Sequence, residues 1–117
     1  EAQTARADKL ALEFAEQAAA AAREGYVEQA RGVIYRMRGE LDRAEEMCKK
    51  ALAINEKLGR QEGMANQYGN LGGIAKDRGD IGRARKLWTQ ARDLFAKIGM
   101  PHQVETAQGW LDELPPG

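Results

Sequence analysis

The sequence repeats itself with a displacement of 40 residues. The run Arg-Gly-Glu-Leu-Asp-Arg-Ala at 38–44 returns as Arg-Gly-Asp-Ile-Gly-Arg-Ala at 78–84, and Gly32 recurs as Gly72. A fixed period of this size is typical of proteins built from stacked supersecondary units. Each unit cannot cover its own apolar face, so its neighbours must cover it. The repeat therefore predicts a stacked-repeat fold before any single residue is interpreted.

The composition favours helices along the whole chain. Ala, Glu, Lys, Leu and Arg dominate, long β-branched runs are missing, and a hydrophobic content of 43% is enough for a core. Apolar residues between Ile81 and Ile98 follow helical steps of three and four, and the same stripe runs from Leu41 to Leu58. We predict an all-α chain with helices near 2–19, 20–37, 41–58, 61–77, 81–98 and 102–114.

Glycines bracket these helices and also occur inside them. We expect left-handed glycines at the helix ends, where only glycine avoids a steric penalty; they are Gly39, Gly59, Gly79 and Gly99. Asp80 is expected to accept hydrogen bonds from the first amides of its helix, and Glu40 is a weaker cap. Gly32 and Gly72 lie inside helices, where glycine costs about 1 kcal/mol relative to alanine. We expect a neighbouring helix backbone to approach closely there. For the same reason Ala84 should be a point of close helix packing.

We predict a single domain over residues 1–117. It comprises the second helix of a degenerate preceding repeat, two repeats, a capping helix and a tail, at 1–20, 21–60, 61–100, 101–114 and 115–117. Ala19 occupies the place of the helix-ending glycines, so two alternatives remain open. Either the chain turns near residue 20, or residues 2–37 form one unbroken helix that is exchanged between two chains in a homodimer.

Charge and composition exclude several function classes. The 18 basic and 18 acidic residues balance, which argues against a dedicated nucleic-acid binder. No apolar stretch reaches the roughly 20 residues that a membrane helix needs. Cys48 is the only cysteine, so a reducing, cytoplasmic location is expected. The chain begins without methionine, which is compatible with a fragment of a longer protein.

No set of residues suggests catalysis or a cofactor. His102 and Cys48 are the only histidine and cysteine, far short of a four-ligand metal site. Cys48 lies on an apolar stripe and is expected to be a buried small residue. Asp42 and Glu45 are expected to form surface ion pairs with basic residues of their own helix. We therefore predict no enzyme activity, no metal and no cofactor.

The helix pairs resemble the tetratricopeptide repeat, with glycine in the first helix and alanines in the second. In the second unit the matching residues are Tyr68, Leu71, Gly72, Ala84, Trp88 and Ala91. In the first unit they are Gly32, Tyr35, Ala44 and Ala51. The run Tyr-Gly-Asn-Leu-Gly at 68–72 and the 40-residue period are similar to the subclass found in LGN-type and kinesin-light-chain-type scaffolds and in bacterial repeat arrays.

This resemblance implies an α-solenoid of stacked antiparallel helix pairs whose first helices line a concave groove for a peptide or protein partner. By position, the groove residues would be Tyr26, Gln29, Val33, Arg36, Asn66, Asn70, Gly73, Lys76 and Trp110. Asparagine amides both donate and accept, so Asn66 and Asn70 suit a peptide backbone. Gly69 and Gly73 would leave room for a ligand or reflect tight packing.

The resemblance thus implies a non-catalytic protein–protein interaction scaffold. Two other functions stay open at this point. One is a self-assembling structural segment, through helix exchange or end-to-end stacking of ends with opposite charge, −3 over residues 1–30 and +4 over 76–97. The other is a regulatory or sensor segment of a larger signalling protein. Trp88 should be in the core, whereas Trp110 should be half exposed, as a ligand contact or at the site of a lost neighbouring repeat.

Overall fold

The computed structural model describes residues 9, 13, 20, 23–25, 27–29 and 31–116. It contains four helices with defined bounds, which are α2 (Leu41–Leu58), α3 (Gln61–Asp77), α4 (Ile81–Lys97) and α5 (Pro101–Glu113). The described residues from 23 to 37 are also helical, and we call them the first helix. No described residue lies in a strand. The prediction of an all-α fold is confirmed, with helix ends within one residue of those expected.

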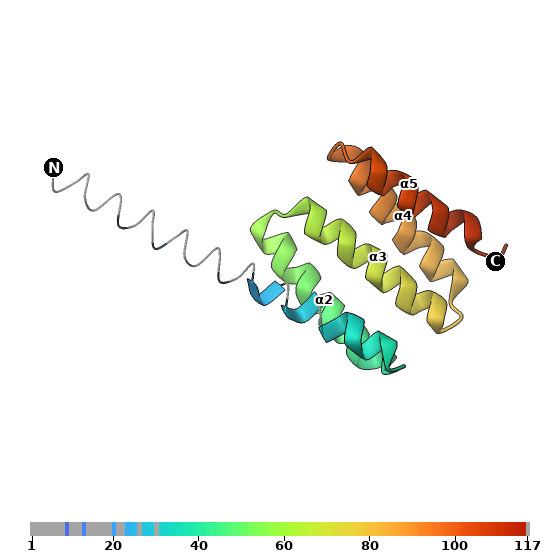
Figure 1. The fold of residues 1–117 in the computed structure, drawn as a ribbon, viewed down its shortest axis with the longest axis horizontal. Coiled ribbons are helices and arrows are strands. Elements are labelled where there is room, and N and C mark those ends of the chain that lie inside the picture. The colour runs from blue at the N-terminus through green and yellow to red at the C-terminus, as the bar shows by residue number, and fades with distance from the viewer. Residues whose placement is uncertain are drawn as a thin grey trace.

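Consecutive helices pack as antiparallel neighbours, α2 on α3, α3 on α4 and α4 on α5 (Figure 1). The turns between them share one geometry, because the only described residues with positive φ are four glycines spaced 20 residues apart. The amide after each glycine donates to the carbonyl five residues earlier, as from Asp80 to Ala75 at 2.8 Å. This bond and the left-handed glycine end each helix and reverse the chain. The four glycines are Gly39, Gly59, Gly79 and Gly99.

The helix starts differ in their caps. Asp80 accepts a hydrogen bond from the Arg83 amide at 3.1 Å, which confirms the predicted N-cap of α4. Glu40 makes no side-chain capping bond to α2, and its carboxylate pairs instead with Arg43 at 3.3 Å. The longer Glu side chain reaches a partner one turn along more easily than it folds back on its own helix end. Pro101 is the first residue of α5, where a missing amide proton leaves no bond unmade.

The buried faces of α2 and α4 repeat residue for residue. In α2 the buried residues are Ala44, Cys48, Ala51 and Asn55. In α4 they are Ala84, Trp88, Ala91 and Phe95, each 40 positions further on. The two alanine pairs keep the helices close, while the other two positions change from Cys and Asn to Trp and Phe. The two units therefore share a backbone plan and differ in how their interiors are filled.

The interior glycines receive side chains from neighbouring helices. A Cβ added at Gly72 would overlap the Trp88 indole, and one at Gly32 would lie 2.9 Å from the Sγ of Cys48. The expected approach of a neighbouring backbone is wrong at Gly72, where all three nearest atoms belong to the indole. For a Cβ added at Gly32, the next nearest atom after the Cys48 sulfur is the Ala44 carbonyl oxygen, at 3.5 Å. Glycine is used in the first helix and α3 because a side chain of the paired helix needs the space.

Two features of the N-terminal region were left open by the sequence. The residues that decide whether 2–19 and 20–37 form one helix or two lie outside the described residues. Most of the predicted half-repeat 1–20 also lies outside them. The domain boundaries remain predictions. Within the described part of the chain, no helix is long and apolar enough to cross a membrane.

Candidate functional site

Three cavities open between alternate helices. Two lie between the first helix and α3, and the third lies between α3 and α5. The second and third are adjacent, because Arg36 and Asn70 line both. We call the residues that line the three cavities the inner groove. All eight described residues of the predicted groove line it.

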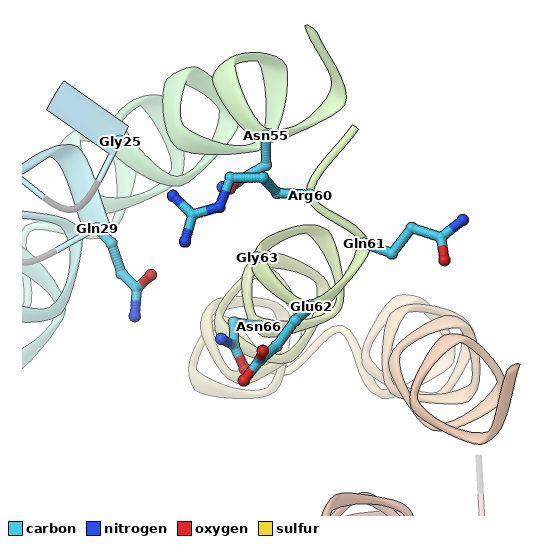
Figure 2. Close-up of a pocket in the computed structure, with 8 residues that line it drawn as sticks. All are labelled: Gly25, Gln29, Asn55, Arg60, Gln61, Glu62, Gly63 and Asn66. Atoms are coloured by element: carbon cyan, nitrogen blue, oxygen red, sulfur yellow. The ribbon is translucent and has the colours of Figure 1, made fainter. Parts of the chain in front are cut away.

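The first cavity is polar and has a volume of about 270 Å³. Figure 2 shows Gln29 on the wall formed by the first helix, and Asn66 with Glu62 on the wall formed by α3. Both predicted residues of this region, Gln29 and Asn66, therefore face one space. The complete lining is Gly25, Gln29, Asn55, Arg60, Gln61, Glu62, Gly63 and Asn66.

Asn55 is the buried polar residue among those that line this cavity. It is 6% exposed and donates its Nδ2 to the Ala51 carbonyl at 2.8 Å, which satisfies one end of the buried amide. The equivalent residue of the next unit is Phe95, which is buried in an apolar cluster with Ala65 and Ala91. An amide in place of a phenyl ring leaves space and polar walls. Our sequence reading missed Asn55, although its alignment with Phe95 across the 40-residue period was a usable signal.

The second cavity is more apolar, with a volume of about 230 Å³. It brings together the predicted residues Val33, Arg36 and Asn70, and the Cys48 thiol lies at its base. Burial raises the pKa of Cys48 to about 11, so the thiol is neutral and unreactive at neutral pH. The structure thus agrees with a packing role for Cys48. The other lining residues are Gly32, Met37, Ile74 and Asp77.

The third cavity, also about 230 Å³, contains five of the predicted residues. They are Arg36, Asn70, Gly73, Lys76 and Trp110, together with Gly69, Trp88 and Glu113. A Cβ added at Gly69 would lie 3.2 Å from the Trp110 ring, and one at Gly73 would meet the Arg36 guanidinium. Of the two readings of these glycines, tight packing is the one that the structure supports.

Arg36 connects the first helix to α3. Its Nε donates to the Asp77 carboxylate at 2.7 Å, and its Nη2 donates to the second oxygen at 3.4 Å. The guanidinium therefore lies over Gly73 in a fixed orientation, at the boundary of the second and third cavities. Both groups are more than one third exposed, so the pair orients Arg36 more than it stabilises the fold.

A chain of amides crosses from the first helix to α3. Gln67 is fully buried, and its Nε2 donates to the Oε1 of Gln29 at 2.8 Å. Its Oε1 accepts from the Nδ2 of Asn70 at 3.4 Å. This arrangement leaves the Asn70 carbonyl oxygen as the acceptor for any other donor in the groove. Gln67 was missed by the sequence reading, because a glutamine between apolar positions gives no periodic signal of burial.

The two tryptophans form the α5 end of the groove. Trp88 is 6% exposed, as predicted for a core residue, and its ring centroid lies 5.6 Å from that of Trp110 with the rings tilted by 41°. This is within the range of favourable aromatic pairs. Trp110 itself is partly buried and packs against the core cluster of Trp88 and Leu111. It lines the third cavity with the exposed part of its ring.

The shortest ion pairs lie away from the groove. Arg78, just before the α3–α4 turn, bridges Asp42 and Glu45 of α2 at 2.6 Å each, and Arg83 of α4 reaches Glu45 at 3.0 Å. The expectation of pairs within one helix holds for Lys49 with Glu45 at 3.3 Å but misses these contacts between units. The hydrogen bond from Arg78 is the main cause that lowers the pKa of Glu45 below its ordinary value.

Tyr26, the ninth predicted groove residue, lies outside the described residues. Among the residues that the structure describes, no three His, Cys, Asp or Glu side chains are grouped closely enough to hold a metal ion.

A profile of the tetratricopeptide repeat matches residues 24–97 of the chain, which covers the first helix and α2, α3 and α4. A comparison with curated proteins finds no match.

Proposed function

Because the chain belongs to the tetratricopeptide repeat family, we propose that its inner groove binds an extended or helical peptide segment of a partner protein. Tetratricopeptide repeats generally mediate protein–protein interactions and are generally non-catalytic. One observation links this function to the inner groove. The eight described residues that the family resemblance assigns to a groove all line three cavities on alternate helices.

The chemistry of the groove favours recognition of a peptide backbone. The side-chain amides of Asn66 and Asn70 contain both donors and an acceptor, so they can pair with backbone groups whatever the side chains of the peptide are. Trp110 offers an aromatic surface to one apolar anchor, the type of contact that often dominates binding energy. Charge contributes little selectivity, because Arg36 is paired with Asp77 and the third cavity contains both Lys76 and Glu113.

We further assign the chain to the subclass with a 40-residue unit. The four left-handed glycines spaced 20 residues apart support this assignment, because two helices and two such turns make one unit. The proposal includes a cytoplasmic location, in keeping with a free, buried Cys48.

The test is a screen of displayed peptides against the purified chain, followed by affinity measurements with variants. We expect Asn70→Ala to weaken the binding of a selected peptide by roughly five- to fiftyfold, the range for one or two lost hydrogen bonds. Gln90→Ala is the matched control, because Gln90 is an exposed amide on α4 outside the groove. If Asn66 and Asn70 can both be replaced by alanine in a folded chain without loss of any selected peptide, the assignment of the groove is wrong.

A further inference from the structure

The first helix leaves large apolar side chains in solvent. The exposed large hydrophobic residues among those described are Val27, Val33, Ile34 and Met37, and all four are on this helix. Val33 and Met37 line the second cavity, so they belong to the inner groove. Val27 and Ile34 are 47% and 48% exposed, line none of the three groove cavities, and lie two helical turns apart on one side of the helix. We call Val27, Arg31 and Ile34 the open face.

Comparison of the two units shows that the open face lacks a covering helix. Ile34 is equivalent to Ile74 of α3, which is 2% exposed and belongs to a core cluster with Ala44 and Cys48 of α2. The same residue type, in the same register, is thus covered in one unit and exposed in the other. The difference is a helix of the α2 type packed on the N-terminal side of the unit.

Residues 2–19 have the sequence of such a helix. Shifted by 40 positions, Leu12 corresponds to Leu52, and Asp8 corresponds to Cys48. Cys48 shares its cluster with Leu71, whose equivalent on the open face is Arg31. An apolar pair between the two units, Cys48 and Leu71, is therefore matched one period earlier by two residues of opposite charge, Asp8 and Arg31. Such complementary replacement is what a real interface between the two segments requires.

The two described residues in the middle of this segment agree with the register. Lys9 and Glu13 are helical and exposed, as are their equivalents Lys49 and Ala53 in α2. At these two described positions the segment therefore matches the outer side of α2.

The turn chemistry argues against the chain covering its own open face. Each reversal between helices uses a glycine with φ between 68° and 81°, followed by a residue outside the helices. Ala19 and Ala20 occupy the places of this glycine and the residue after it, and Ala20 is helical. An alanine in the left-handed conformation carries a steric penalty that glycine avoids. A sharp reversal at this place is therefore disfavoured relative to the four glycine turns.

We infer that two copies of this chain exchange residues 2–19, and that each segment covers the Val27–Ile34 face of the other copy. The contact is isologous and closes after two chains, so it produces a dimer and not a filament. This inference concerns self-association. It is independent of the peptide that the inner groove binds, and either can fail alone.

Disulfide trapping between two different variants tests the exchange directly. Leu12→Cys chains and Ile34→Cys chains are mixed, incubated to equilibrate and oxidised. We expect a covalent dimer containing one chain of each kind, identified by mass. Cys48 can stay, because it is buried with a raised pKa, and each variant oxidised alone reports any reaction of Cys48. Absence of the mixed dimer would overturn the inference, as would a link within one chain in the double variant.

Sedimentation provides the second measurement. The unmodified chain should be a dimer at micromolar concentration, and Ile34→Glu should shift it to monomer by placing a charge in the covered face. Gln90→Glu, at an exposed site on α4, is the matched control and should stay dimeric. Ile34 is half exposed within one chain, so the variant should retain its helical circular dichroism. A monomeric unmodified chain at about 100 μM would rule out the exchange.

Discussion

Trp88 of α4 donates its indole N–H to the backbone carbonyl of Gly69 in α3, at 2.8 Å. The bond forms inside a helix whose carbonyls are already used, and it is possible because the indole lies against Gly72, which has no side chain. Trp88 thus accounts for the glycine at position 72, and its own buried indole N–H has a hydrogen-bond partner. The Trp110 ring also lies against Gly69, so α3, α4 and α5 meet at this point.

Replacement of Trp88 by phenylalanine should therefore destabilise the fold. The variant loses the bond to Gly69 and part of the ring that fills the space beside Gly72. We expect a loss of about 2–3 kcal/mol in the free energy of unfolding, from the hydrogen bond and the reduced packing together. Urea denaturation followed by circular dichroism measures this loss. Equal stability of the variant and the parent would show that the bond to Gly69 contributes nothing.

Gly72→Ala should also destabilise the fold, although alanine has the higher helix propensity. The propensity gain is about 1 kcal/mol, whereas a Cβ that overlaps the Trp88 indole costs about 1–3 kcal/mol through overpacking. Gly109→Ala in α5 is the control, because no atom within 4 Å would meet its Cβ. We expect opposite signs, with Gly109→Ala raising the thermal midpoint and Gly72→Ala lowering it. A rise in both would mean that α3 and α4 are not closely packed.

The 40-residue period predicted the backbone plan because its determinants are local. A glycine can adopt the left-handed conformation wherever the chain must reverse, and Asp80 caps the helix that it directly precedes. The burial of Trp88 followed from helical spacing alone. These features depend on residues that are near in sequence, so one sequence was enough to locate them.

The details of the groove depend on contacts between distant residues, and the sequence did not predict them. Gln67 meets Gln29 across 38 positions, and Arg78 meets Asp42 across 36. Helical periodicity assigns a residue to a face but does not say which side chain lies opposite. The first cavity is lined by Asn55, which occupies the place of Phe95, and its volume follows from packing that only the three-dimensional arrangement defines.

Ala84→Leu should be strongly destabilising. Ala84 has no exposed surface and lies in the cluster with Trp88 and Leu111, so the added carbons have no space. Overpacking of this kind typically costs 1–3 kcal/mol. Ala96→Leu, at an exposed position of the same helix, is the matched control and should change stability by less than about 0.5 kcal/mol. An unchanged melting temperature for Ala84→Leu would contradict the close helix spacing.

The bridge from Arg78 to Glu45 should make stability depend on pH in the acid range. The folded state lowers the pKa of Glu45 from the ordinary value of 4.5, chiefly through the Arg78 hydrogen bond. The unfolded chain then binds more protons than the folded chain, so this contribution is complete above about pH 4.5 and declines as the pH falls through the folded pKa. Arg78→Gln should remove most of it, with a loss below about 1 kcal/mol at pH 7 because Arg78 is one third exposed. Unfolding in urea between pH 2.5 and 7 measures the difference, and the curves of parent and variant should converge at the acid end.

Arg38→Gln is the control, because Arg38 is the repeat equivalent of Arg78 at an exposed site, and its offset from the parent should not vary with pH. A gap between parent and Arg78→Gln that stays constant down to pH 2.5 would show that Glu45 is not the group to which Arg78 is coupled.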